Sequence, residues 1–451
     1  MEIVVLLAFA IICLFACTRP PVAFALVILM FPMEIVLQST SSFLRTPGIG
    51  IKMVNIAIGV AVLLAALGSS FRAPGFMRAF LTPTSVMAYG LLVWGAVTLL
   101  WSPGREAGLE ALQGQLPYFV VILLLGPLLV PRVDVLVSSI SATLMITTAL
   151  CTIVLVNPEF LVKDGRLGLD LGAGVRSNPL ALGELGGLAI LLGALVRRSQ
   201  LGALALPIRV GAVLVGAAVA IQSGSRGQFF YAILVAVPFL PLAAPVKSAR
   251  NLILAFISVL FMAFAASFLM DTLLSGFAAK RFSSDELIYG SSSSSTRVEN
   301  VLALGQAWVQ SPVAWVLGLG FYAFNGLFSD AGNIYSHVLF ADVIFELGLP
   351  GVALMSGFLY FVIRDAFRLF NFASSAPLTR AACAVLIALF AYQLLLVNKQ
   401  GNLWGSMYFF LTGIIISRLV ATLDKGADAM NDVAVSCPPH LSGGPLSATP
   451  L

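Results

Sequence analysis

The sequence contains little charge. Only 10% of its 451 residues are Asp, Glu, Lys or Arg, whereas 59% are hydrophobic, and the mean hydropathy is +1.01. Because soluble domains carry about 25% charged residues, this composition excludes an ordinary soluble protein. The apolar runs are continuous over roughly 20 residues instead of alternating, which disfavours a transmembrane β-barrel. The sequence therefore predicts an all-α, polytopic integral membrane protein.

Residues that commonly bind metals or cofactors are also scarce. The chain has five cysteines and two histidines, with no CxxC, HxxxH or DxD-type cluster. Most of the cysteines lie inside apolar runs and are interpreted as small hydrophobic residues. A Walker-type phosphate loop is absent, and no GxGxxG follows a strand. We therefore expect no metal, no cofactor, no nucleotide hydrolysis by this chain and no nucleic-acid partner.

Hydrophobic runs predict twelve or thirteen transmembrane helices. They lie near residues 2–17, 21–40, 52–69, 83–101, 115–131, 134–156, 178–196, 201–222, 228–246, 251–274, 337–363, 378–398 and 402–420. Pro20 and Pro21 separate the first two runs, since proline can end one helix and begin the next. Residues 1–156 are predicted to form an N-terminal group of helices, 157–274 a central group with Arg-bearing loops, and 337–420 a C-terminal group.

The distribution of Lys and Arg predicts the orientation. Short connections that share one side carry basic residues with few acids: Arg197, Arg198, Lys247, Arg250, Arg364, Arg368 and Arg380. Cytoplasmic loops show such an excess of Lys and Arg. In loops 157–177 and 275–336, acidic residues offset the basic ones, so these loops are predicted to face the periplasm or exterior. The tail 421–451, rich in Ser, Pro, Gly and Ala, is predicted to be cytoplasmic and disordered.

The large loop 275–336 carries a predicted surface helix. Thr296 and Glu299 have the spacing of a capping box at a helix start. The apolar positions that follow suit an amphipathic helix lying on the membrane surface. Ser311-Pro312 is predicted to end this helix, and the sequence GLGF after it to form a tight turn.

His337 is the residue best placed for proton transfer. It ends the polar stretch and opens the apolar run HVLFADVIFELGLPGVALM. Histidine titrates near neutral pH and often acts as a general base, although a boundary histidine can also be a hydrogen-bonding anchor. Asp342 and Glu346 follow, and either could orient or neutralise the imidazole. Alternatively, Glu346 caps the helix that breaks at GLPG.

Arg226 lies in the polar break QSGSRGQ between two strongly apolar helices. An arginine at mid-membrane depth costs roughly 2.5–3.5 kcal/mol on insertion scales. It either snorkels to the surface or binds an anion, with Gly224 and Gly227 letting the backbone approach. The predicted orientation places this break outward, against the positive-inside trend, which favours anion binding.

Three further arginines are candidates for an anion site. Arg176 precedes a predicted helix start at Asn178, where free N–H groups favour an anion. Arg166 lies in the same loop. Arg297 is either an exposed helix-start residue or part of the site. Glu184, about two turns into the helix after Asn178, is expected to pair with an arginine.

These motifs together resemble the O-antigen ligase and O-antigen polymerase superfamily. The resemblance covers about residues 160–365 and includes four stretches: GRLGLDLGAGVRSNPLALG, SGSRG, STRVENVLALGQAWVQSPVAWVLGLGFYAF and SHVLFADVIFELGLPG. It implies that Arg176 or Arg166, with Arg226, holds the diphosphate of a polyprenyl-linked glycan. Arg297 would bind the donor or order the outer loop, and His337 would activate the acceptor hydroxyl.

The sequence departs from the family pattern at two points. Val338 follows His337 where the family often has Asn. The spacing from Arg166 to Asn178 is longer than usual, which leaves open whether Arg166 or Arg176 is the equivalent arginine.

The resemblance implies a metal-independent, inverting glycosyltransferase of the bacterial inner membrane, acting on the periplasmic or exterior face. Its donor would be an undecaprenyl-diphosphate-linked oligosaccharide, and its acceptor a glycan or lipid hydroxyl, amid membrane lipids. The product would enter lipopolysaccharide or exopolysaccharide biosynthesis. Polymerase and ligase reactions fit equally. Two other classes stay open: a small-anion transporter, for which Glu34 and Asp342 lie inside apolar runs, and a scaffold in polysaccharide export.

Overall fold

The protein is a multi-pass helical membrane protein. A computed structural model describes residues 2–41, 43–46, 50–70, 81–163, 166–172, 175–197, 201–243, 292–328, 336–373 and 376–436. Over these residues the chain is mainly helical, with one small sheet, so the predicted all-α class is confirmed. The predicted run 251–274 and the first part of the large loop lie outside the described residues.

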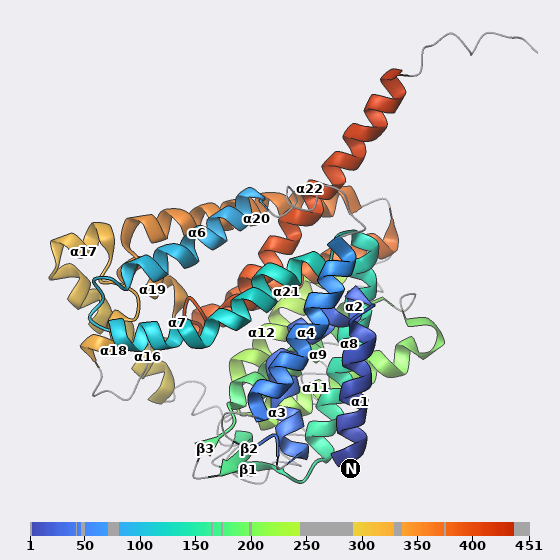
Figure 1. Cartoon of the computed structure of the whole chain (residues 1–451), viewed down its shortest axis with the longest axis horizontal. Coiled ribbons are helices and arrows are strands. Elements are labelled where there is room, and N and C mark those ends of the chain that lie inside the picture. Colours follow the sequence, from blue (N-terminus) through green and yellow to red (C-terminus); the bar gives the residue numbers. More distant parts are fainter. Residues whose placement is uncertain are drawn as a thin grey trace, which may run out of the picture.

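Figure 1 shows the arrangement of the helices and the sheet. Before the sheet, the chain forms α1 (Glu2–Ala16), α2 (Pro20–Ile28), α3 (Met30–Thr40), α4 (Gly50–Ser70), α6 (Pro83–Thr98), α7 (Arg105–Tyr118) and α8 (Val133–Val156). After the sheet, it forms α9 (Pro179–Leu195), α11 (Ala205–Gln222), α12 (Arg226–Ala243), α16 (Ser292–Val309), α17 (Pro312–Leu317), α18 (Ala323–Leu327), α19 (Leu339–Phe345), α20 (Gly348–Phe372), α21 (Pro377–Gln400) and α22 (Met407–Ser436). A π-helical segment, Phe119–Leu125, and a 3₁₀ turn, Gly126–Leu129, extend α7, and a 3₁₀ turn, Gly202–Leu204, precedes α11.

Six helical segments in the described ranges are long and apolar enough to cross a membrane: Lys52–Ser70, Arg105–Leu129, Val133–Val156, Gly202–Gln222, Arg226–Ala243 and Pro377–Gln400. The bent pair α2 and α3 adds a seventh. Each coincides with a predicted apolar run. Three further apolar helices, Glu2–Ala16, Pro179–Leu195 and Met407–Leu423, are shorter. The described ranges therefore hold six or seven candidate spans, where the whole sequence predicts twelve or thirteen.

The run 21–40 is not one straight helix. It breaks at Leu29, and α2 and α3 meet at an angle of 78°. Pro32 lies in the first turn of α3 and has no N–H to donate to a carbonyl of the preceding turn. The backbone at the break turns toward the interior of the protein, where Leu29 and Met30 are fully or almost fully buried.

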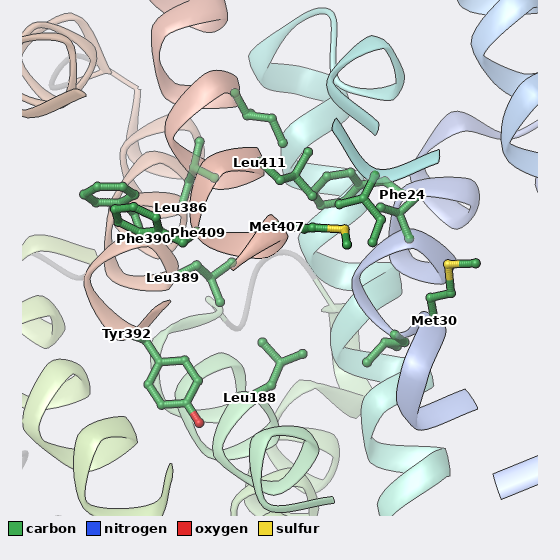
Figure 2. Close-up of a cluster of buried hydrophobic side chains, with 14 of the residues drawn as sticks. Phe24, Met30, Leu188, Leu386, Leu389, Phe390, Tyr392, Met407, Phe409 and Leu411 are labelled. Carbon is green, nitrogen blue, oxygen red and sulfur yellow. The ribbon is translucent and has the colours of Figure 1, made fainter. Parts of the chain in front are cut away.

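The core of the bundle is made of aromatic and aliphatic side chains from several helices. Phe390 of α21 stacks on Phe409 of α22 with ring centroids 5.2 Å apart. Figure 2 shows Phe24 and Met30 on the opposite side of this cluster from the stacked rings. Leu188 and Leu389, labelled in the same view, both line one cavity among the helices. Packing of this cluster positions α2, α3, α9, α21 and α22 around one interior space.

A small antiparallel sheet, not predicted from the sequence, occupies loop 157–177. It consists of β1 (Phe160–Lys163), β2 (Arg166–Gly172) and β3 (Val175–Arg176) in the order β1-β2-β3. Leu167 and Leu169 are buried and lie two residues apart, so their side chains share one face of β2. The sheet lies at one end of the bundle, and the C-terminal part of α22 projects from the other (Figure 1).

Two predicted boundaries differ from the structure. Helix α16 begins at Ser292, so Thr296 lies within the helix and does not cap it; four consecutive serines extend the helix backward. Helix α22 continues to Ser436, into the segment predicted as a disordered tail. The residues just after the span include several helix-favouring Ala, Leu, Lys and Met, and residues 437–451 lie outside the described part.

Helices α9 and α11 pack with their backbones in close approach. A Cβ atom added to Gly186 would lie 2.5 Å from the carbonyl oxygen of Gly216 and 2.7 Å from the backbone nitrogen of Ala220. Small residues at such crossings are common in membrane proteins, because they let helices approach closely. A methyl group at residue 186 would push the two helices apart.

We expect Gly186→Ala to destabilise the protein by about 1–3 kcal/mol, the usual cost of overpacking. The measurement is the temperature at which the detergent-solubilised protein loses its monodisperse peak in size-exclusion chromatography. Gly211→Ala in α11 is the matched control, since a Cβ there meets no atom within 4 Å. Equal unfolding temperatures for the two variants would contradict the packing described here.

Candidate functional site

An interior cavity of about 600 Å³ lies among the helices. Its walls come from α2, α3, α7, α9, α21 and α22, together with Tyr322. Ligand pockets of proteins usually measure about 300–1,000 Å³. Its rim includes Ser177 and Asn178 from the chain entering α9, and Gln400 and Asn402 from the end of α21. The cavity therefore has the size of a binding site and begins beside the small sheet.

The small sheet places Arg166 and Arg176 on neighbouring strands. Arg166 is the first residue of β2. Arg176 is the last residue of β3 and lies opposite Asp170 of β2 in the strand register. Immediately after Arg176, Ser177 Oγ accepts a hydrogen bond from Leu169 N at 2.8 Å, which fixes β3 beside the cavity. The side chains of both arginines lie outside the described part. Their role in diphosphate binding stays a prediction.

The predicted helix start after Arg176 is confirmed. Asn178 is the N-cap of α9, and its Oδ1 accepts the N–H of Leu180 at 2.9 Å. Glu184, two turns on, accepts a hydrogen bond from Gln393 Nε2 of α21 at 2.7 Å. The carboxylate expected to pair with an arginine thus has an amide partner across the cavity.

Arg226 is the first residue of α12 and follows a turn in which Gly224 has φ 67°. A left-handed φ favours glycine. The turn fits closely against α9, since a Cβ on Gly183 would lie 2.5 Å from Cβ of Ser225. The backbone N–H groups of a helix start and a permanently charged guanidinium are both suited to an anion.

Lys399 is a second cation beside this turn, and sequence analysis missed it. Its Nζ donates to Gln228 Oε1 at 3.0 Å, and its side chain lies where a Cβ on Gly227 would be. Gly227 therefore makes room for the side chain of Lys399, and the predicted approach of an anion to its backbone stays a prediction. The only sequence signal is a lysine in the last turn of an apolar helix, a position that the helix dipole favours.

His337 and Arg297 lie close enough to interact electrostatically. His337 precedes α19 and is outside the candidate membrane spans. Burial, and then the positive charge of Arg297, lower the pKa of His337 from its ordinary value of 6.5. Both effects favour the neutral imidazole, which is the form that accepts a proton. The structure thus brings together two of the predicted site residues from separate segments.

The backbone of His337 is strained. His337 has φ 67° and, with Tyr322, is one of the two non-glycine residues with positive φ among those described. Such conformations cost about 1–3 kcal/mol and often occur at functional sites. Ser336 stabilises the turn: its Oγ accepts from Val338 N at 3.1 Å and donates to Asp342 Oδ1 at 2.5 Å. Asp342 therefore supports His337 through Ser336 and the backbone.

Glu346 stabilises the turn at Tyr322, which is the other non-glycine residue with the strained, positive φ. Its buried carboxylate accepts hydrogen bonds from Tyr322 N at 3.1 Å and Phe324 N at 3.0 Å. These are the free N–H groups at the start of α18, so Glu346 caps that short helix and not the one at GLPG. The predicted cap at GLPG is therefore wrong, and a role of Glu346 toward His337 stays a prediction. Tyr322 is thereby fixed as a wall of the cavity.

The segments GLGF and SHVLFADVIFELGLPG, which belong to two motifs of the family resemblance, contact each other. Leu319 N donates to the carbonyl oxygen of Phe345, and Gly320 N to that of Glu346, both at 2.9 Å. Gly318 and Gly320 have φ 79° and 94°, so the predicted tight turn is confirmed. This pairing joins the end of the outer-loop segment to the end of α19. Helix α19 also packs against α16, which carries Arg297, and against α21, which carries Lys399.

Within the described ranges, no group of three or more His, Cys, Asp or Glu side chains could hold a metal ion. Neither a protein-family model nor a curated protein matches the chain. Fold and site define a multi-pass helical membrane protein with a cavity lined by apolar, amide and acidic side chains.

We expect Glu346→Ala to lower stability by about 1–3 kcal/mol for each buried N–H that it leaves unpaired. Glu346→Gln retains one carbonyl acceptor and should lie between this variant and the wild type. The control is Glu299→Gln on the exposed face of α16. Thermal unfolding in detergent measures the effect, and an unfolding temperature of Glu346→Ala equal to that of the control would refute the capping role.

Proposed function

We propose that the protein transfers a glycan from a polyprenyl-diphosphate carrier to an acceptor hydroxyl, as the O-antigen ligase and polymerase superfamily does. The observation that carries this proposal is that His337, at the strained turn before α19, is partly buried and within electrostatic range of Arg297, both of which lower the pKa of its imidazole. A proton acceptor beside a fixed cation suits a reaction in which a hydroxyl is deprotonated while a phosphate group leaves. The resemblance of both segments to that family supports the same reaction.

The reaction is a single displacement. The acceptor oxygen attacks the anomeric carbon as the bond from that carbon to the diphosphate oxygen breaks, and the diphosphate leaves with the electron pair. His337 takes the hydroxyl proton. The anomeric centre is inverted, and no metal is required if cationic side chains stabilise the leaving group.

Arg226 and Lys399 are the proposed binding groups for the diphosphate. Arginine binds phosphate through paired N–H donors, and the start of α12 adds backbone N–H groups. Arg176 or Arg166 would complete the site from the small sheet, and Arg297 would contact the donor near His337. In this proposal the site faces the periplasm or exterior of a bacterial inner membrane.

One observation favours the transport alternative, and another opposes it. The broken pair α2 and α3 beside the cavity resembles the discontinuous helices at transporter binding sites. However, the described residues that line the cavity include Glu34 and Glu184 and no Arg, Lys or His. Carboxylates would repel a small anion, so anion transport is the weaker proposal.

We expect His337→Asn to reduce glycan transfer about 100-fold or more, the usual range for a general base, and Arg226→Ala to reduce it by weakening the binding of the diphosphate. Asn is used because it tolerates the left-handed backbone at residue 337. The measurement is the amount of surface polysaccharide on gels, in a strain that lacks the chromosomal gene, at matched protein levels. Arg132→Ala is the control, since Arg132 is exposed and forms an ion pair with the neighbouring Asp134. Full activity of both site variants would overturn the proposal.

We expect transfer by the purified protein to be constant from pH 7 to 8 and to fall as the pH decreases below about 6.5, the unperturbed pKa of histidine. The sign follows from the lowered pKa: His337 stays neutral, and able to accept a proton, to a lower pH than free histidine. Replacing Arg297 by Gln removes a nearby positive charge, so the pKa of His337 should rise and the acid limb should move to higher pH.

Arg132→Gln is the control for this shift. An acid limb that stays in place in Arg297→Gln, or moves to lower pH, would show that Arg297 does not act on the catalytic base.

A lipid-linked single repeat unit distinguishes the two reactions of the class. Incubated alone with the protein in liposomes, it should yield a ladder of products if the protein is a polymerase. If the protein is a ligase, product should form only when a lipid or glycan acceptor is added. No product under either condition would contradict glycan transfer itself.

A further inference from the structure

Four hydrogen-bonding side chains of the cavity lining form a belt on three helices. Glu34 and Gln38 belong to α3, Glu184 to α9 and Gln393 to α21. Leu188 of α9 and Leu389 of α21 also line the cavity, so it combines hydrogen-bonding and apolar surfaces.

The first part of this belt lies on α3. Glu34 Oε1 accepts from Gln38 Nε2 at 3.2 Å, and Glu34 Oε2 accepts from Asn55 Nδ2 at 3.0 Å. Asn55 also donates to the hydroxyl oxygen of Tyr118 at 2.9 Å. These contacts hold the Glu34 carboxylate in one position, while the residue keeps part of its surface accessible to the cavity.

The second part spans α9 and α21. In the described contacts Glu184 accepts one hydrogen bond, from Gln393, although a carboxylate offers about four acceptor sites. Both side chains line the cavity and are partly accessible. Tyr408 lies within electrostatic range of both Glu34 and Glu184, so the two parts of the belt face one interior space.

This set of groups fits an uncharged, polyhydroxylated ring. Sugar hydroxyls donate to carboxylates and exchange hydrogen bonds with side-chain amides. The C–H faces of a sugar ring can pack on aromatic rings, whose faces carry partial negative charge, and Phe31, Tyr322 and Tyr408 line the same cavity. A diphosphate would be repelled by the carboxylates, and the cations that suit it lie outside the described lining.

We infer that Glu34 with Gln38, and Glu184 with Gln393, form a binding site for the hydroxyl groups of the sugar residues of the lipid-linked glycan. This inference rests on the proposed function and assigns the two parts of the donor to two different sets of residues. The basic groups around Arg226 and Lys399 bind the diphosphate, and the acidic and amide belt binds the sugars.

Binding measurements on the purified full-length protein test the division. One probe is the lipid-linked oligosaccharide fraction extracted from the source strain after deletion of this gene. The other is undecaprenyl diphosphate without sugar. We expect Glu34→Ala and Glu184→Ala each to weaken binding of the glycan-bearing probe by about 10-fold or more, the effect of losing hydrogen bonds to a charged group, and to leave binding of the bare carrier unchanged. Unchanged binding of the bare carrier also shows that the variants are folded.

Glu159→Ala is the matched control, since Glu159 pairs with Arg45 at 2.9 Å and is not part of the cavity lining. Arg226→Ala should weaken both probes. If the two glutamate variants weaken both probes equally, the cavity holds the carrier and the inference is wrong; if they weaken neither, it is also wrong. Failure of the wild-type protein to bind either probe overturns the proposed function as well.

Discussion

The contact on which the site depends is the one between the Glu346 carboxylate and the backbone of residues 322–324. A buried carboxylate is costly unless its oxygens are hydrogen-bonded, and buried N–H groups at a helix start need an acceptor. Each satisfies the other. These hydrogen bonds join the outer-loop segment to the C-terminal end of α19 and fix Tyr322 in the cavity wall. His337 lies at the other end of α19. A site built from several loops needs a contact of this kind to hold the loops in place.

Hydropathy was sufficient to predict the class of fold and the six or seven candidate spans within the described residues, because apolar length is a property of each segment alone. The break at Leu29 and the strands of loop 157–177 depend on interactions with other segments, which no single segment specifies. The same distinction holds for the site. The turn at Gly318 and the helix start at Asn178 are local and were predicted correctly. The positions of Lys399 beside Gly227 and of Gln393 beside Glu184 require knowledge of which helices are neighbours.

Charge is separated within the molecule. The charged residues of the described cavity lining are acidic, whereas the cations Arg226 and Lys399 lie at the start of α12 and in the last turn of α21. A glycolipid donor has the same division, with neutral sugars on one side of an anionic diphosphate. Under the proposed function, this separation would give the two ends of the donor different surroundings and so specify its direction as well as its affinity. Asp342 and Ser336 serve a different purpose, because they shape the backbone that carries His337.

The bend at Leu29 also bears on how the protein is made. Helices α2 and α3 have 9 and 11 residues, and at about 1.5 Å per residue neither covers the roughly 30 Å of a bilayer core. The backbone groups at the ends of these two helices, and the side chain of Glu34, need protein partners, which α4, α8 and α9 supply. These helices leave the ribosome later than the segment they shelter. Helices α2 and α3 therefore reach their final positions only after α4, α8 and α9 have been inserted into the membrane. Insertion of this chain thus depends on contacts between segments that are far apart in the sequence.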